Sequence, residues 1–241
     1  MIFYINDIFC KNNNLSYCIL LKNYSIRRRR INEKKKKCIL KCWKKYGIDF
    51  NYQKLDFFLL FPLNQFVLIE IGFGNGKLFI KKALRNPHIN FIGIEIHPAS
   101  IFSALLYARQ YHVTNIKIIF YNALDVLNYM IPDKSIGIFQ IFFPDPWFKL
   151  KHHKRRLINL NFIRLIEKKL IKKGYVHIIT DCNSYSQKIS TLMHNFSFFK
   201  RIFLDTPMNP LLGTRDLTKF EKKGILLNNT IYDYKYQFLK I

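Results

Sequence analysis

The chain has 241 residues, which is enough for one domain with a sizeable buried core. Its formal charge is +25, because 40 Lys and Arg residues outnumber 15 Asp and Glu residues, and this favours a polyanionic partner such as a nucleic acid. The longest uncharged stretch near the start, residues 12–21, is too short to span a bilayer, which argues against a membrane protein. Lysine outnumbers arginine by 29 to 11, the bias that an AT-rich genome gives to any protein. The placement of the charge therefore carries more weight than its sum.

Five cysteines are scattered through the chain without a Cys-x-x-Cys pair or a convincing zinc spacing. Cys38 and Cys42 lie four residues apart on a predicted helix, but no pair of histidines follows at finger spacing. An odd, scattered set in a chain of this size predicts reduced thiols. We therefore expect a soluble, cytoplasmic protein without a metal site.

The first 47 residues are predicted to form a basic N-terminal extension with one helix. Asn32 is a suitable N-cap for a helix that runs to about Lys45 and stops at Gly47. Runs of four arginines (residues 27–30) and four lysines (residues 34–37) suit a solvated face, and they also suit phosphate contacts. We expect residues 48–241 to form a single domain.

From residue 66 onward, continuous apolar runs alternate with helical patterns. We expect strands over residues 66–71, 91–95, 116–121, 136–142, 175–180, 198–204 and 231–239, and helices over residues 76–85, 99–112, 157–171 and 183–194. Buried strands that alternate with helices of ten or more residues predict an α/β fold with a mostly parallel, seven-stranded sheet. Such sheets bind ligands at the carboxyl ends of their strands, near the switch in strand order.

A glycine-rich turn follows the first of these strands, with the sequence Glu70-Ile-Gly-Phe-Gly-Asn-Gly76. Gly72, Gly74 and Gly76 allow a tight turn and a close approach of a ligand to the backbone. The spacing is not the G-x-G-x-x-G that seats a pyrophosphate. The carboxylate of Glu70 would repel a pyrophosphate and favour an ammonium or sulfonium group. The motif therefore indicates S-adenosylmethionine rather than NAD.

Two further polar residues end the next strands. Glu95 ends the second strand and is placed to accept hydrogen bonds from ribose hydroxyls. Asn122 follows the third strand, where its side chain is expected to meet adenine. Together with the glycines, these residues predict a nucleoside-cofactor site.

An acidic turn between two prolines follows the fourth strand, in the sequence Phe143-Pro-Asp-Pro-Trp147. The prolines hold Asp145 in a stiff, non-helical segment, from which its carboxylate should project over the cofactor site. Trp147 offers a flat face for a base. The basic residues that follow are expected to contact phosphates, namely Lys149, Lys151, His152, His153, Lys154, Arg155 and Arg156.

The string Phe-Phe-Pro-Asp-Pro-Trp-Phe-Lys-Leu-Lys-His-His-Lys-Arg-Arg-Leu, residues 142–157, resembles the signature of bacterial tRNA (guanine-N7)-methyltransferases. The glycine motif, residues 93–95, 180–181 and 218–221 fit the same family in order and spacing, and the resemblance covers residues 25–241. Eukaryotic relatives, which work with a WD-repeat partner, tend to carry His at the position of Trp147. The resemblance implies a Rossmann-like methyltransferase fold with helices on both faces of the sheet.

The resemblance also implies roles for individual residues. Glu70, Glu95, Asn122 and Asp145 would contact S-adenosylmethionine or line its site. The target nucleotide would be held by Lys149, Asp181, Thr218, Lys219, Phe220 and Glu221, and the basic loop would lie along the tRNA. Asn122 replaces a common Asp, Cys182 stands where an aromatic residue is frequent, and Asn228, Asn229 and Tyr232 replace a typical Gly-His and Trp.

The expected reaction is methyl transfer to N7 of a guanosine in the variable loop of tRNA. N7 carries a lone pair and no proton, so its attack needs alignment rather than a general base. We expect Asp145 to hold the guanine and stabilise the growing positive charge, and Trp147 or Phe148 to stack on the displaced base. The enzyme is expected to act as a monomer or homodimer without an obligate protein partner.

Two other functions compete with this one. The first is methylation of an amino group of adenine, cytosine or glutamine, which uses an Asp/Asn-Pro-Pro-aromatic turn, and here the second proline is missing. The second is a non-catalytic tRNA-binding relative. The retained glycines and the acidic residues Glu70, Glu95 and Asp145 argue against it, because a pure RNA binder has no use for them.

Overall fold

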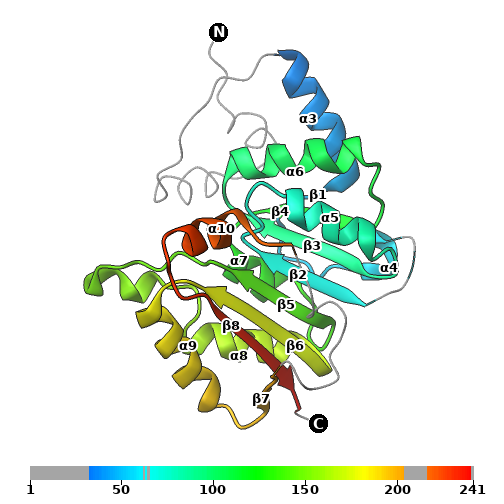
Figure 1. Cartoon of the computed structure of the whole chain (residues 1–241). Coiled ribbons are helices and arrows are strands. Elements are labelled where there is room, and N and C mark those ends of the chain that lie inside the picture. The colour runs from blue at the N-terminus through cyan, green and yellow to red at the C-terminus, as the bar shows by residue number, and fades with distance from the viewer. Residues whose placement is uncertain (1–32, 62, 64–65, 204–215, 240–241) are drawn as a thin grey trace.

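The sheet of this protein has eight strands in the part of the chain that the computed structural model describes, which is residues 33–61, 63, 66–203 and 216–239 (Figure 1). The strands are β1 (Gly47–Ile48), β2 (Val67–Ile71), β3 (Asn90–Glu95), β4 (Ile116–Phe120), β5 (Ile136–Phe142), β6 (Leu170–Thr180), β7 (Phe199–Arg201) and β8 (Tyr232–Phe238). The predicted Asn32 cap and the arginine run at residues 27–30 lie outside the described residues.

The strand order is β1-β4-β3-β2-β5-β6-β8-β7, and among these described strands β8 alone runs in the direction opposite to the others, antiparallel to both β6 and β7. The chain therefore builds outward from β2 in one direction as far as β4, and then returns to place β5 on the other side of β2. The switch in strand order lies between β2 and β5. In open α/β sheets, ligands bind beside the carboxyl ends of the strands at this switch.

Helices cover both faces of the sheet (Figure 1). They are α3 (Glu33–Tyr46), α4 (Phe57–Leu60), α5 (Lys77–Arg85), α6 (Pro98–Gln110), α7 (Ala123–Asp125), the π-helix η1 (Val126–Met130), the 3₁₀ helix η2 (Leu150–Arg155), α8 (Leu160–Lys169), α9 (Asn183–His194) and α10 (Lys219–Leu226). One apolar cluster joins α3, α5 and α6 to the sheet, and a second joins η1, α8 and α9 to the opposite face. Successive strand residues point to opposite faces of the sheet, and those of β2 and β3 are all buried, so the two faces form two cores.

Helix α3 packs against α6 through Ile39, Trp43 and Tyr46, whose hydroxyl donates to the carbonyl of Ala108 at 3.0 Å. The indole ring of Trp43 lies over Gly47, where an added Cβ would stand 2.1 Å from the ring. Only glycine fits there, and the helix ends at this point. The domain boundary after residue 47 stays a prediction.

Most of the predicted elements are confirmed, and the differences have local causes. The helix predicted over residues 157–171 begins at Leu160, because the side chain of Asn159 accepts a hydrogen bond from the amide of Phe162 at 3.1 Å and caps it. It ends at Lys169, since β6 begins at Leu170 beside Ile136 of β5. The short elements β1, α4, α7, η1 and η2, and also α10, were not predicted, because so few residues carry little periodic signal.

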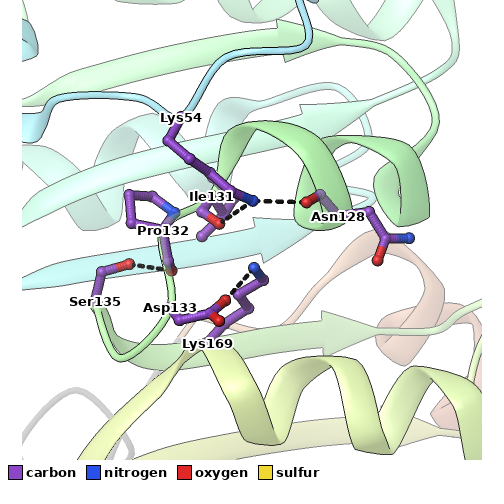
Figure 2. Close-up of polar contacts among 7 residues, drawn as sticks. All are labelled: Lys54, Asn128, Ile131, Pro132, Asp133, Ser135 and Lys169. Carbon is purple, nitrogen blue, oxygen red and sulfur yellow. Dashed lines mark hydrogen bonds and ion pairs between the residues drawn. The ribbon is translucent and has the colours of Figure 1, made fainter.

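The amino edge of the sheet, opposite the expected site, holds two lysines and one carboxylate (Figure 2). The ammonium of Lys54 donates to the carbonyls of Asn128 and Ile131 at 2.6 and 3.1 Å, which satisfies the end of η1. Lys169 donates to Asp133 at 2.5 Å. Burial and repulsion from Lys169 lower the pKa of Lys54. The hydrogen bond from Lys169 lowers the pKa of Asp133, so this cluster favours the ionised carboxylate.

Candidate functional site at the carboxyl edge of the sheet

The glycine loop, residues 72–76, links β2 to α5. Three of its residues have left-handed backbone conformations. The φ angles of Gly72, Gly74 and Gly76 are 75°, 61° and 76°. A Cβ added at Gly72 or Gly74 would meet nothing within 4 Å, whereas one at Gly76 would stand 2.4 Å from the Cβ of Ala104 on α6. The first two glycines therefore leave open space for a ligand, and the third lets α6 pack against the loop.

Glu95 ties the end of β3 to the glycine loop. Its carboxylate accepts hydrogen bonds from the amides of Gly74, Ile96 and His97, at 3.1, 2.8 and 3.1 Å. Burial raises the pKa of this carboxyl, while the charge of His97 and the three amide donors oppose the shift. The side chain thus holds the loop open, and its predicted contact with a ribose stays a prediction.

Glu70 differs from the expectation of a carboxylate aimed at the ligand alone. Its Oε2 accepts a hydrogen bond from the ammonium of Lys82 on α5 at 2.7 Å, and the two side chains are 7% and 15% exposed. Lys82 also donates to Oε1 of Gln140 and lies 5.1 Å over the ring of Phe142. A cation of the protein itself therefore already balances the acidic residue of the motif.

Asn122 caps α7 at the end of β4. Its Oδ1 accepts from the amides of Leu124 and Asp125, at 2.8 and 3.4 Å. The same oxygen is the acceptor predicted for the adenine amine. These two donors already use both lone pairs of the oxygen, so a bond from the adenine amine would have to replace the longer one, from Asp125, and this contact stays a prediction.

The elbow, residues 143–147, follows β5 at the switch point. Phe143 and Trp147 have φ angles of 50° and 45°, which side-chain-bearing residues adopt at a cost of about 1–3 kcal/mol each. Between them, Asp145 is exposed. Burial raises the pKa of the nearby Tyr185 hydroxyl, and the charge of Asp145 raises it further. The elbow is a strained turn that presents one carboxylate beside the glycine loop.

Arg156 holds the elbow from beneath, and this corrects its prediction as an RNA contact. Its side chain is buried, with the residue 2% exposed, and Nε donates to the carbonyl of Pro146 at 2.7 Å. The guanidinium also donates to Oγ of Ser184 at 3.0 Å and lies 4.7 Å over the ring of Tyr185. A guanidinium in this position has no free surface for a phosphate, because its donors are engaged inside the protein.

The other basic residues after the elbow lie on η2 and just before it. Lys149, Lys151, Lys154 and Arg155 are exposed, and His152 and His153 are half-buried. The guanidinium of Arg155 lies 5.0 Å over the ring of Trp147, so that face of the indole is already covered. Phe148 is 80% exposed. Of the two aromatic residues predicted to stack on a base, Phe148 is therefore the more accessible.

Helix α10 lies beside the end of β6. Thr218 and Glu221 form a capping box, in which Glu221 N donates to Thr218 Oγ1 at 3.0 Å and Thr218 N donates to Glu221 Oε2 at 3.2 Å. The ring of Phe220 stacks on Phe143 of the elbow, with centroids 6.1 Å apart. A Cβ added at Gly224 would stand 3.8 Å from the Cβ of Asp181. These contacts bring the predicted substrate residues of two distant segments together with the elbow, while Lys219 is exposed beside them.

Sequence reasoning missed Lys82, Ser184 and Tyr185, which support the acidic residues of the site. Tyr185 accepts a hydrogen bond from the amide of Ile158 at 2.8 Å and fixes the segment after η2. The sequence does place Lys82 next to the buried face of α5, which is formed by Phe79, Ile80 and Ala83, and this position could have indicated that its ammonium points inward. In the described part of the chain, no group of three His, Cys, Asp or Glu side chains is placed to hold a metal ion. Nor is any helix of these residues long and apolar enough to cross a membrane.

Comparison with known proteins decides the family. Residues 64–234 match a family model described as "Putative methyltransferase". A tRNA (guanine-N(7)-)-methyltransferase of Buchnera aphidicola is 38% identical over 242 residues, which cover 98% of this chain and 99% of that protein. The chain belongs to the tRNA (guanine-N7-)-methyltransferase family.

Other members of the tRNA (guanine-N7-)-methyltransferase family match over similar lengths. The enzyme of Aliivibrio fischeri is 36% identical over 90% of this chain and 91% of its own length. Among solved structures, the crystal structure of TrmN from Thermus thermophilus has a TM-score of 0.50 at 11% identity, and covers 72% of this chain and 44% of that one. This structural likeness supports the α/β methyltransferase fold alone.

Proposed function

We propose that this protein transfers a methyl group from S-adenosylmethionine to N7 of a guanosine in the variable loop of tRNA. The observation that carries the proposal is the elbow, which presents the exposed carboxylate of Asp145 next to the glycine loop at the switch between β2 and β5. Family membership supports the same reaction. In this proposal the cofactor is bound by Gly72, Gly74, Glu70 and Glu95. The guanine base is bound by Asp145.

The glycine loop fits the proposed cofactor. Open space beside Gly72 and Gly74 admits an adenosyl group close to the backbone, and carboxylates at Glu70 and Glu95 suit an amino group and ribose hydroxyls. When bound, S-adenosylmethionine supplies an electrophilic methyl group on a positively charged sulfur. The chain has to orient the guanine toward that methyl and keep the loop from collapsing, which is the work of Glu95 in this proposal.

Asp145 positions the guanine and lowers the energy of the transition state. N7 attacks with its own lone pair, so the carbon–N7 bond forms while the carbon–sulfur bond breaks and no proton leaves the base. Positive charge moves onto the purine during the transfer. A carboxylate that accepts hydrogen bonds from N1–H and the amino group becomes a stronger partner as that charge grows. Asp145 thus acts by electrostatics and not as a general base.

In this proposal Phe148 stacks on the displaced base, and α10 helps to bind its nucleotide. Drawing a guanosine out of its stack costs a few kcal/mol, roughly what one aromatic stacking contact returns at ~1–3 kcal/mol. Phe148 is exposed next to the elbow, and Phe220 is exposed on α10. In the proposed complex, Lys149, Asp181 and residues 218–221 hold the nucleotide, while the exposed cations of η2 lie on phosphates.

The substrate sets further expectations. We expect the enzyme to work in the cytoplasm on tRNA, without an obligate protein partner, as a monomer or homodimer. Size-exclusion chromatography with light scattering, with and without tRNA, measures the oligomeric state and the stoichiometry.

The direct test is incubation of purified protein with unmodified tRNA transcripts and S-adenosylmethionine labelled on the methyl group, followed by nucleoside mass spectrometry. The proposal predicts 7-methylguanosine in the variable loop, and its loss in Asp145→Ala. Methyl groups on adenine or cytosine amines would reassign the chain to amino-group methylation. Bound tRNA without any transfer would leave a non-catalytic binder.

A further inference from the structure

An ion pair lies beneath the glycine loop, between the two strands that flank the switch point. Glu70 of β2 and Gln140 of β5 are register partners, and the ammonium of Lys82 contacts both side chains. Phe142, two residues further along β5, lies under the same ammonium at 5.1 Å. Lys82 therefore stands between the start of the glycine loop and the start of the elbow.

The surroundings of this ammonium are buried. The side chains of Glu70 and Lys82 are 7% and 15% exposed, and Gln140 is fully buried. Nε2 of Gln140 has no hydrogen-bond partner in the described part of the molecule, because the amide turns its oxygen toward Lys82. Charges in such a place are poorly screened by solvent, so each acts over several ångströms.

We propose that Lys82 sets how strongly the site distinguishes the cationic methyl donor from its neutral product. This inference rests on the proposed function. S-Adenosylmethionine carries one more positive charge than S-adenosylhomocysteine, and the two differ otherwise by one methyl group. Glu70 alone would favour the cationic ligand, whereas the paired ammonium of Lys82 offsets that preference. Lys82 is thus a positioning residue, which fixes the Glu70 carboxylate and balances its charge.

This balance has a kinetic purpose in a transfer reaction. A site that held the sulfonium with an unbalanced carboxylate would bind the ground state tightly, and binding that is equal or stronger in the ground state does not raise the rate of the chemical step. With Lys82 in place, the transfer of positive charge from sulfur to the purine is opposed less by Glu70 and is assisted by Asp145.

Calorimetric titration of the full chain with both ligands tests the proposal. The measured quantity is the Kd of S-adenosylhomocysteine divided by the Kd of S-adenosylmethionine. Lys82→Gln should raise this ratio roughly fivefold or more, as expected for one poorly screened charge nearby. Lys82→Arg keeps the charge and should keep the ratio, and Lys81→Gln is the matched control, since Lys81 is an exposed neighbour on the same helix.

A second pair of variants guards against misfolding, because Lys82→Gln leaves Glu70 buried without its cation. Glu70→Gln and the double variant Glu70→Gln/Lys82→Gln contain no unpaired buried carboxylate at this place. The ratio of the Kd of S-adenosylhomocysteine to that of S-adenosylmethionine should be roughly fivefold or more higher in the double variant than in Glu70→Gln. Sinefungin, which carries an amine in place of the sulfonium, should follow S-adenosylmethionine if charge decides and S-adenosylhomocysteine if the methyl group decides.

The outcomes separate the two proposals. Wild-type protein that binds neither ligand would overturn the proposed function and this inference with it. Wild-type protein that binds both, with an equal ratio in Glu70→Gln and the double variant, would overturn the role of Lys82 alone. A sinefungin affinity that follows the product would also count against it.

Discussion

Two lysine–carboxylate pairs at opposite edges of the sheet have the same chemistry and different surroundings. At the carboxyl edge, the side chains of Lys82 and Glu70 are 15% and 7% exposed, so little water reaches either charge. At the amino edge, Lys169 is 4% exposed but its partner Asp133 is 62% exposed (Figure 2). Water stabilises the exposed carboxylate of the second pair. In the first pair little water reaches either charge, so each depends on its partner and on neighbouring groups of the protein.

This difference separates the candidate binding site at the carboxyl edge from a structural contact at the amino edge. The amino-edge pair closes the turn before β5, together with the hydrogen bond from Ser135 to the carbonyl of Pro132 at 2.8 Å. The carboxyl-edge pair lies under a loop that leaves open space and beside a strained elbow. Substitutions at the amino edge should therefore change the stability of the fold, and those at the carboxyl edge should change ligand binding and reaction rate.

The largest effect on rate is expected from Asp145→Asn. Loss of the carboxylate charge should lower kcat/KM by about 100- to 1,000-fold, the usual loss when an electrostatic partner of the transition state is removed. Since Asp145 is exposed, the melting temperature should stay unchanged. Single-turnover rates with tRNA and a thermal melt measure the two quantities. Full kcat in this variant would exclude the proposed role.

Arg156→Met should be an exception to this division between the two edges, because it should lower both stability and rate. Arg156 is buried at the carboxyl edge and supports the elbow. Its loss leaves the Pro146 carbonyl without its donor and empties the space over Tyr185. We expect a loss of about 3 kcal/mol in the free energy of unfolding and a lower rate. Arg155→Met, one residue earlier and exposed, should change stability little. Equal urea midpoints for the two variants would contradict the structural role of Arg156 beneath the elbow.

Asp133→Asn sharpens the comparison by giving the opposite result, a change in stability without a change in rate. The lost carboxylate leaves the buried Lys169 ammonium unpaired, at about 1–2 kcal/mol. The pKa of Asp133 is lowered in the folded protein from its ordinary value of 3.8, so its contribution is complete above that value. Urea denaturation should therefore separate variant and wild type at pH 7, and the gap should close as the pH falls below about 4.

Phe148→Ala should weaken the enzyme by about tenfold in kcat/KM for tRNA, within the range of one lost stacking contact. Trp147→Phe is the matched comparison, because the indole is already covered by Arg155 and packs against His152. Binding of the cofactor should not change in Phe148→Ala. Unchanged tRNA kinetics in this variant would assign the stacking to another ring.

The smallest effects are expected from the exposed lysines of η2. Lys151→Ala and Lys154→Ala should each reduce the slope of log K against log salt for tRNA binding by about one unit. Neither should alter the melting temperature. A slope that matches the wild type in both variants would place the phosphates elsewhere on the surface.

The strands other than β1 and the order of the motifs could be predicted from the sequence, because continuous apolar runs and glycine spacing are local signals. The strand over residues 136–142 and the helix over residues 183–194 are found with the predicted ends. The side-chain partners could not be predicted from local pattern. Arg156 stands last in a run of cations, and only the packing of Pro146 and Ser184 around it distinguishes it from Arg155.

Likewise, nothing in the spacing of the motif predicted that Glu70 has a partner on α5. Lys82 lies 12 residues further along the chain, on α5, and its long side chain reaches Glu70 of β2 and Gln140 of β5. Long-range pairing of this kind depends on helix packing, which a single sequence does not encode as a local pattern. The contacts that support the candidate site residues could therefore not be predicted from the sequence, and the roles of those residues stay predictions.

The position of β8 between β6 and β7 bears on how the protein is made. β8 follows the other seven strands in the chain, yet it is the neighbour of both β6 and β7 in the sheet. During synthesis, the glycine loop and the elbow can fold while the outer edge of β6 is still bare, and a bare strand edge is prone to pairing with other chains. Because α10 comes shortly before β8, a chain that ended before residue 219 would lack both the helix that contacts the elbow and the strand that covers the edge of β6.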